Sequence, residues 1–291
     1  MKKFTVNPGI KRKISSAVRI AVQISFFIML PSAFTTAFSG IKYIFTAIGG
    51  GEYIEITSFV SVLIVLCAFT IIFGRFFCGF ACAFGSLGDW VRAIYVNVCR
   101  KLKKTPVTIN KKLLKYLSLV KYVVLISIIL LCFIGLYGKT AGYSPWEVFS
   151  MVTAGNLKFG SHITGVILLI LIIIGMAVCE RFFCLVLCPM GAVFSMLPVL
   201  PFSVLKRNRE QCIKGCSACQ NKCPSGIGLP DLENGNNQDI RTGDCFMCGK
   251  CIDTCPKGNI RLSGFVWKGN EIWFILFRAA ILAGLLIFAG I

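Results

Sequence analysis

The chain has 291 residues, of which 56% are hydrophobic and only 15% are charged, and its mean hydropathy is +0.78. Soluble domains have about a quarter of their residues charged, so this composition excludes an ordinary soluble monomer as well as a disordered chain. Thirty-one basic residues against 12 acidic ones leave a net charge of +19, a balance typical of proteins that meet nucleic acid or a membrane surface. The high hydropathy favours the membrane, and no nucleic-acid partner is expected.

Five apolar stretches are long enough to predict membrane helices of about 20 residues. They are residues 14–38, 56–77, 113–136, 163–183 and 272–291. Pro31 should kink the first stretch or end it early, because proline cannot continue a helical hydrogen-bond ladder. The last stretch is the weakest of the five predictions, since it contains Arg278 and an arginine in mid-span costs about 2.5–3.5 kcal/mol on insertion scales.

Basic residues gather on one side of these stretches. Before the first, after the second and after the fourth stretch lie Lys2, Lys3, Lys11, Arg12, Lys13, Arg92, Arg100, Lys101, Lys103, Lys104, Lys111, Lys112, Lys206, Arg207 and Arg209. The opposite loops hold only Lys42, Lys139 and Lys158. Since basic loops stay in the cytoplasm, the pattern predicts a multi-pass protein of the inner (cytoplasmic) membrane with a cytoplasmic N-terminus and an external C-terminus.

The chain repeats itself with an offset of 106 residues. It reads GRFFCGFACAFG at residues 74–85 and ERFFCLVLCPMG at residues 180–191, so that Arg75 matches Arg181 and Cys78 matches Cys184. Each copy is predicted to be a two-span hairpin closed by an Arg-Phe-Phe-Cys-x3-Cys segment. Two spans per copy make the repeats parallel and relate them by a pseudo-two-fold axis along the membrane normal, with both segments on the cytoplasmic side.

Half of the 16 cysteines fall in two compact runs, a spacing typical of metal ligands rather than of a disulfide framework. The second run is Cys-x2-Cys-x2-Cys-x3-Cys-Pro, the bacterial ferredoxin pattern for a [4Fe–4S] cluster. The first run has one extra residue, because Ile213 stands where a cysteine is expected. The eight cysteines are Cys212, Cys216, Cys219, Cys223, Cys245, Cys248, Cys251 and Cys255.

The ferredoxin pattern also predicts how the two runs share their ligands. The last cysteine of a run ligates the other cluster, so Cys223 should join Cys245, Cys248 and Cys251, while Cys255 should join the first three cysteines of the first run. Zinc is the alternative, since it also binds paired Cys-x2-Cys motifs. A proline after each run favours two [4Fe–4S] clusters.

The repeated pairs are less specific. If the segments are helical, cysteines at i and i+4 share one face. Small thiols could simply pack where a helix leaves the membrane. The alternative is a shared site, because the pseudo-two-fold axis would bring Cys78, Cys82, Cys184 and Cys188 together as soft ligands for copper(I), zinc or an additional iron–sulfur centre.

Charged side chains flank these pairs. For Arg75 and Arg181 the favoured role is snorkelling to lipid headgroups, and the alternative is to hold thiolates anionic or to offset cluster charge. The nearest acids, Asp89 and Glu180, are expected to pair with the arginines, or else to move the protons of quinol oxidation.

Several cofactor sites are absent from the sequence. One histidine, His162, cannot supply the two imidazoles of a b-type haem, and no Cys-x-x-Cys-His attaches a c-type haem. No Gly-x-Gly-x-x-Gly opens a βαβ unit, so no NAD site is expected. The clusters must therefore exchange electrons with a partner redox protein, a quinone or a small diffusible acceptor.

Hairpins that end in Phe-Cys-x3-Cys-Pro, followed by an eight-cysteine dicluster unit, resemble the NapH/NosR/CcoG-like membrane ferredoxins. The resemblance covers residues 56–261, is most specific at CLVLCPMG (residues 184–191), and is closest to NapH-like proteins. It implies electron transfer between the quinone pool and exported reductases, or support of metal-centre assembly, in some members as copper reductases. The chain departs from the family at Ala83, which replaces a proline, in the longer first run, and in its fifth apolar stretch.

Together these patterns predict an all-α polytopic membrane protein of about five transmembrane helices, with a small α+β dicluster ferredoxin-like domain on the cytoplasmic face. The expected units are two hairpins at residues 1–105 and 106–205, the cluster domain at 206–265 and a C-terminal helix at 266–291. The expected function is an electron relay through two [4Fe–4S] clusters between the quinone pool and a partner redox protein. A copper reductase or metal-centre assembly factor, and a non-catalytic redox sensor, are the alternatives.

Overall fold

The computed structural model describes residues 8–138, 143–156, 162–200, 204–208, 210–229, 242–262 and 271–291. Within these ranges the chain is mostly helical, as predicted. The boundary expected at residue 265 and several charged residues used to predict orientation, namely Lys2, Lys3, Lys139, Lys158 and Arg209, lie outside them.

The first apolar stretch forms two helices instead of one. Helix α1 (Pro8–Met29) ends just before Pro31, and α2 (Ala33–Gly50) begins just after it. The two helices are bent by 58° relative to each other, because the proline ring clashes with the preceding turn and its nitrogen cannot donate to it. The predicted interruption at Pro31 is confirmed.

The second and fourth stretches are shorter as helices than the sequence predicts. Helices α3 (Ser58–Phe73) and α8 (Ile163–Val178) have 16 residues each, about 24 Å at 1.5 Å per residue. Each gives way, a few residues later, to a five-residue π-helix, η1 (Phe77–Ala81) or η3 (Phe183–Leu187). The chain then continues into α4 (Ala83–Lys101) or α9 (Pro189–Met196).

The third stretch meets the length and composition of a membrane span. It comprises α5 (Lys111–Leu117) and α6 (Val120–Phe133), and an 18-residue window within Lys112–Phe133 has a mean hydropathy of 2.3. Among the described residues it is the one helix that is long and apolar enough by itself to cross a membrane, and the bent pair α1–α2 is long and apolar enough when taken together. The other apolar helices are shorter: Ser58–Phe73, Ile163–Val178 and Ile272–Phe288. The prediction of five spans is therefore neither confirmed nor excluded by helix length.

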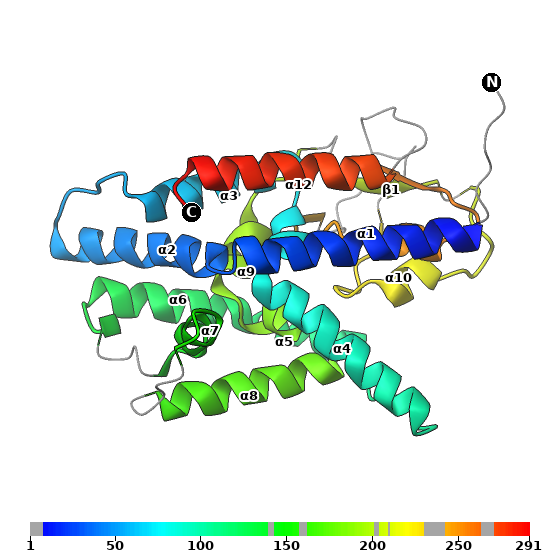
Figure 1. The fold of residues 1–291 in the computed structure, drawn as a ribbon, viewed down its shortest axis with the longest axis horizontal. Coiled ribbons are helices and arrows are strands. Elements are labelled where there is room, and N and C mark those ends of the chain that lie inside the picture. The colour runs from blue at the N-terminus through cyan, green and yellow to red at the C-terminus, as the bar shows by residue number, and fades with distance from the viewer. Residues whose placement is uncertain are drawn as a thin grey trace.

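The helices pack against one another (Figure 1), and aromatic rings fill the centre between them. Helix α2 packs against α3 and α6, α4 against α8, and the short α7 (Pro145–Thr153) also against α8, while α12 (Glu271–Phe288) lies along α1 and α3. Phe34, Phe84 and Phe183 meet where the two π-helices approach each other, with ring centroids 5.3 Å apart for the first two and 4.4 Å for the last two. This centre positions the functional residues.

A small α+β unit lies at one end of the helices, at the right in Figure 1. Strand β1 (Leu205–Arg207) pairs antiparallel with β2 (Ile260–Leu262), with Leu205 opposite Leu262 and Arg207 opposite Ile260. Between them along the chain come α10 (Ala218–Lys222), the 3-10 turn η5 (Thr242–Asp244) and α11 (Lys250–Thr254). The pair brings together the two ends of the segment that carries both cysteine runs.

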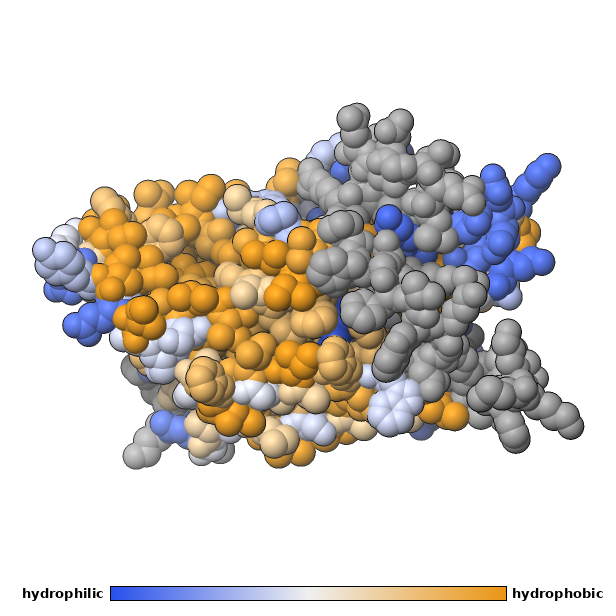
Figure 2. Space-filling model, turned by 90° about the horizontal axis from the view of Figure 1, so that it is seen from above, coloured by the Kyte–Doolittle hydropathy of each residue, from blue (hydrophilic) through white to orange (hydrophobic). Residues whose placement is uncertain are grey.

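The surface of the molecule has an apolar region and a hydrophilic region. Figure 2 shows a broad apolar area over the helical body and hydrophilic residues gathered at the end that holds the small unit. Helices α6 and α8, which lie below α1 and α2 in Figure 1, also carry exposed apolar side chains, including Ile126, Leu130, Ile167, Ile170 and Ile174. Isolated apolar residues are normal on a soluble surface, but a continuous apolar band on neighbouring helices is typical of contact with lipid.

Candidate iron–sulfur and thiol site

Both Cys-x3-Cys segments fold in the same way, but not as the α-helices assumed from the sequence. Cys78 and Cys184 lie inside the π-helices η1 and η3, and Cys82 and Cys188 then cap α4 and α9. The Cys188 sulfur accepts a hydrogen bond from the Gly191 amide at 3.1 Å. A π-helix is closed by hydrogen bonds between residues i and i+5, and the second cysteine of each pair lies beyond the π-helix, so the two thiols are not placed as at positions i and i+4 of one α-helix. The α-helical argument for pairing these thiols is therefore wrong.

The thiols of the two segments nevertheless meet. Cys82 and Cys184, from different repeats, are within hydrogen-bonding reach of each other, and Cys188 lies within electrostatic range of Cys184 and Cys78. All four are buried. The side chains described in the structure include no group of three or more His, Cys, Asp or Glu already arranged to hold a metal ion, so the shared metal site stays a prediction.

The two arginines of the repeats are completely buried, which excludes the snorkelling role favoured by the sequence. Arg181 reaches across to the first repeat, where it donates to the carbonyl oxygens of Cys78 and Gly79 and pairs with Asp89, Nε lying 3.1 Å from Oδ1. Snorkelling fails because these carbonyls and the carboxylate supply, inside the protein, the polar partners that a headgroup would supply at the surface.

Arg75 occupies the corresponding position in the first repeat and has different partners. Its Nη1 lies 3.3 Å from Asp244, in the small unit. Its Nε and Nη2 are buried without a hydrogen bond of normal geometry, and its charge acts on the thiols of Cys78, Cys184 and Cys188. A buried guanidinium with unsatisfied nitrogens is costly unless negative charge lies nearby, and thiolate ligands would provide it.

The loop of the second cysteine run docks directly on these arginines. The ring of Phe246 lies 4.7 Å from the Arg75 guanidinium and 5.0 Å from that of Arg181, and cation–π attraction favours both contacts. A Cβ on Gly79 would lie only 2.3 Å from the Phe246 carbonyl oxygen, so this close approach requires glycine. The cluster loop and the first repeat are thus in direct backbone contact.

Five of the eight run cysteines line one small cavity. Cys219 and Cys223 come from the first run, and Cys245, Cys248 and Cys251 come from the second. Thiolates are the ligands of [4Fe–4S] clusters, so Cys223, Cys245, Cys248 and Cys251 have the chemistry of the cluster that the crossed pattern assigns to them, although their sulfurs, like those of the repeated thiols, are not arranged to hold a metal ion. Arg278 of α12 lies within electrostatic range of Cys245, and its guanidinium sits 3.9 Å from the Phe274 ring centroid.

Two of the other run cysteines, Cys212 and Cys255, are linked through Asn259. The Cys255 thiol lies 2.9 Å from Asn259 Oδ1, and Asn259 Nδ2 donates to Cys212 Sγ at 3.4 Å. Arg207 Nη1 donates to Cys219 Sγ at 3.7 Å. The first and last cysteines of the eight are therefore joined by one side chain, as a cluster held by both runs would require.

Sequence reasoning missed several charged residues that join the helices to the small unit. Asp244 accepts a hydrogen bond from Lys121 Nζ at 2.8 Å and also pairs with Arg75. Asp253 pairs with Arg19 at 3.0 Å. Lys121 and Arg19 are nearly fully buried. A lysine and an arginine within apolar stretches were the available signal, since such residues rarely occur there without a buried partner.

Asp89 is the centre of another group of charged side chains, and its expected pairing with Arg181 is confirmed. It also contacts Lys250 at 3.3 Å and accepts a hydrogen bond from Gln23 at 2.9 Å. Burial alone would raise the pKa of Asp89, but the charges of Arg181 and Lys250 and the hydrogen bonds of Arg181 and Gln23 together lower that pKa to about 2. Glu180 pairs with Lys250 rather than with an arginine.

Comparison with known proteins identifies the same regions. A family described as a 4Fe-4S binding domain matches residues 56–106 and 161–207, each of which contains the thiol segment of one repeat and the apolar helix before it, and a 4Fe-4S dicluster domain matches residues 204–256. The uncharacterized protein MJ0749 of Methanocaldococcus jannaschii is 30% identical over 215 residues, which cover 74% of each chain. Ferredoxin-type protein NapH of Haemophilus influenzae is 25% identical over 209 residues, covering 69% of this chain and 66% of NapH. No solved structure matches this chain.

The helical body, the two thiol segments and the eight-cysteine unit define a ferredoxin-type iron–sulfur protein. Similarity extends to proteins named NirI and MauN of Paracoccus denitrificans and NosR of Pseudomonas aeruginosa. The chain belongs to the NapH/NosR-like family of 4Fe–4S ferredoxin-type electron-transfer proteins, and the resemblance seen in its sequence is confirmed.

Proposed function

We propose that this protein is an integral membrane electron relay that connects the quinone pool to a partner redox protein through two [4Fe–4S] clusters. One observation carries the proposal most directly. The loop that holds Cys245, Cys248 and Cys251 packs through Phe246 against Gly79 of the buried thiol segment. A cluster in that loop is therefore adjacent to the apolar helical body and not isolated in a tethered soluble domain.

The charges around the two cysteine groups support an order for the relay. The group of Cys223, Cys245, Cys248 and Cys251 lies in reach of Arg19, Arg75, Arg181 and Arg278. A bound [4Fe–4S] cluster supplies one-electron transfer, and positive charge nearby stabilises its reduced, more negative form. The neighbours of Cys212 and Cys216 in the chain are exposed, whereas residues 246–248 of the other group are buried, so the first run is the side from which a partner protein would exchange electrons.

The membrane arrangement forms part of the proposal. We place the N-terminus and the cluster domain in the cytoplasm and the C-terminus outside, with five crossings of the inner (cytoplasmic) membrane. Basic loops on the cluster side and exposed apolar residues on α6 and α8 support this arrangement. Arg278 is compatible with a C-terminal crossing, because it is buried against Phe73, Phe76 and Phe274 and does not face lipid.

The experiment that tests the relay uses the anaerobically purified chain in detergent with decylubiquinol or decylubiquinone. Oxidation of one quinol releases two electrons and two protons, so two clusters take one electron each and the protons pass to water. We expect the cluster absorbance to bleach with decylubiquinol, or to recover with decylubiquinone after reduction by dithionite. Clusters that respond to dithionite but exchange electrons with neither compound would contradict the quinone link.

A second candidate function is a metal reductase or assembly factor that uses the repeated thiols. The contact between Cys82 and Cys184 favours it, because it joins the two repeats at the atoms that would bind copper(I). Copper retained in a one-to-one ratio after gel filtration would support this function.

A further inference from the structure

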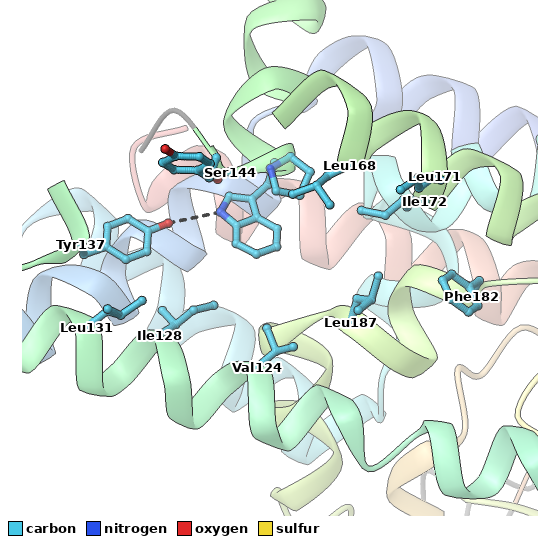
Figure 3. A pocket seen from close by; sticks show the side chains of 13 residues that line it. Val124, Ile128, Leu131, Tyr137, Ser144, Leu168, Leu171, Ile172, Phe182 and Leu187 are labelled. Atoms are coloured by element: carbon cyan, nitrogen blue, oxygen red, sulfur yellow. Dashed lines mark hydrogen bonds between the residues drawn. The ribbon is translucent and has the colours of Figure 1, made fainter. Parts of the chain in front are cut away.

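A large apolar cavity lies between α6, α7 and α8, away from the cysteine runs (Figure 3). Its volume is about 450 Å³. Val124 and Ile128 of α6 form one wall, and Leu168, Leu171 and Ile172 of α8 form the opposite wall, as the labelled side chains in Figure 3 show. Small-molecule sites range from roughly 300 to 1,000 Å³ and are mostly apolar with a few polar groups, so this cavity has the size and lining of a binding site.

Polar groups are concentrated in one part of the cavity. Trp146 Nε1 donates to the Tyr137 hydroxyl at 3.3 Å, the contact drawn as a dashed line in Figure 3. Ser144 lies beside Tyr137 and is 6% exposed, yet its hydroxyl makes no hydrogen bond of normal geometry. The Tyr137 oxygen, the nearby acceptor, already accepts from Trp146, so an oxygen acceptor on a bound ligand would satisfy the buried Ser144 hydroxyl better.

The other part of the cavity borders the thiol site. Phe182 and Leu187 line it, and both belong to the second Cys-x3-Cys segment. A run of aromatic rings also leads from the polar part to this segment: Trp146 contacts Phe38 at 5.3 Å, Phe38 contacts Phe34 at 6.2 Å, and Phe34 contacts Phe183 at 5.9 Å. Phe183 directly precedes Cys184, so densely packed protein joins the cavity to the thiols.

The cavity also has access from the apolar surface. Leu168 and Leu171 line it and are themselves 39% and 56% exposed. In the membrane arrangement proposed above, this side of α8 faces lipid. A ligand could then enter from the bilayer without crossing water.

We propose that this cavity binds a lipid-soluble quinone, whose ring carbonyl accepts a hydrogen bond from Ser144 and whose isoprenoid tail lies between α6 and α8. The assignment rests on the proposed quinone-linked function and gives it a location. A phospholipid acyl chain would also fill the apolar walls, and the experiment below distinguishes it from a quinone. The quinone ring matches both the walls and the polar part.

Binding is tested with decylubiquinone and the purified, cluster-loaded chain, by quenching of Trp146 fluorescence. The wild-type signal should disappear in Trp146→Phe. Val124→Phe, which fills the cavity, should weaken binding at least tenfold, whereas its neighbour Val123→Phe, which is 62% exposed and outside the lining, should bind as the wild type does. Ser144→Ala should weaken binding about fivefold, as expected for loss of one neutral hydrogen bond.

The outcomes separate this site from the proposed function. Quenching that Val124→Phe leaves unchanged would overturn the site, as would a wild-type chain that retains phospholipid and takes up no decylubiquinone. Electron exchange with decylubiquinol that persists in Val124→Phe at equal iron and sulfide content would overturn the site and leave the relay intact. Saturable binding that Val124→Phe abolishes, without electron exchange in the wild type, would support the site and contradict the quinone-linked relay.

Discussion

The Arg181 guanidinium donates to the Gly79 carbonyl oxygen at 2.8 Å, which ties the second Cys-x3-Cys segment to the first. Two glycines, one in each repeat, also lie close to the arginine of the other repeat. A Cβ on Gly85 would lie 3.7 Å from Arg181, and one on Gly191 would lie 3.2 Å from Arg75. Each repeat's arginine thus packs against the glycine of the other repeat. This exchange holds the two thiol pairs together at the centre of the protein.

The first prediction concerns Arg181. Arg181→Lys should lower the free energy of unfolding by about 3 kcal/mol, because lysine keeps the charge but cannot bind Asp89 and two carbonyl oxygens at once. Thermal unfolding of the detergent-solubilised chain, followed by circular dichroism, measures the effect. Arg100→Lys, on the exposed face of α4, is the matched control and should unfold as the wild type does. Equal stability of both variants would show that the buried contacts of Arg181 do not hold the repeats together.

The second prediction concerns the close approach at Gly79. Gly79→Ala should displace the cluster loop, because the new Cβ would lie 2.3 Å from the Phe246 carbonyl oxygen. We expect less iron per chain and a changed electron paramagnetic resonance signal after reduction. Gly284→Ala introduces the same methyl group where no atom lies within 4 Å, and it should leave both measurements unchanged. An unaltered Gly79→Ala protein would contradict the docking of the loop on the first repeat.

The third prediction concerns the number of clusters and their crossed ligands. The wild-type chain should contain about eight irons and eight sulfides, as two cubanes require. Cys223→Ser should alter the cluster held by Cys245, Cys248 and Cys251, whereas Cys255→Ser should alter the other one. Electron paramagnetic resonance of the reduced proteins separates the two signals. Zinc in place of iron, or the same signal lost in both variants while the other persists, would contradict the assignment.

The fourth prediction concerns topology. A phosphatase reporter fused after Ile291, which works only outside the cytoplasm, should be active, and one inserted at residue 235 should be inactive. A green fluorescent reporter should give the opposite pattern. Inactive phosphatase at both positions would mean that α12 does not cross the membrane.

The fifth prediction concerns the repeated thiols. If Cys78, Cys82, Cys184 and Cys188 form one site, Cys82→Ser and Cys188→Ser should each remove the same bound metal or spectroscopic signal. Cys67→Ser, a cysteine of α3 outside the site, is the control. A metal lost in only one of the two variants would indicate separate sites in the two repeats.

The sequence by itself determined the helical class, the interruption at Pro31 and the family. These follow from local chemistry, because apolar length, a missing proline amide and cysteine spacing are visible within a few residues of each other. The repeat was also visible, since matched residues recur at a constant offset. The same reasoning named Asp89 and Glu180 as acids that pair with the repeat arginines; the Asp89 pairing is present, whereas Glu180 pairs with Lys250.

Only the tertiary structure decided the role of the arginines and the local form of the thiol segments. Arg75 and Arg181 look like residues at a membrane edge when only their neighbours in sequence are considered, and their partners Asp244 and Asp89 are far away along the chain. The π-helices could not be predicted, because propensity barely distinguishes them from α-helices and packing between the repeats selects them. The cavity between α6, α7 and α8 is formed by three segments that are separated along the chain, so no local sequence pattern predicts it.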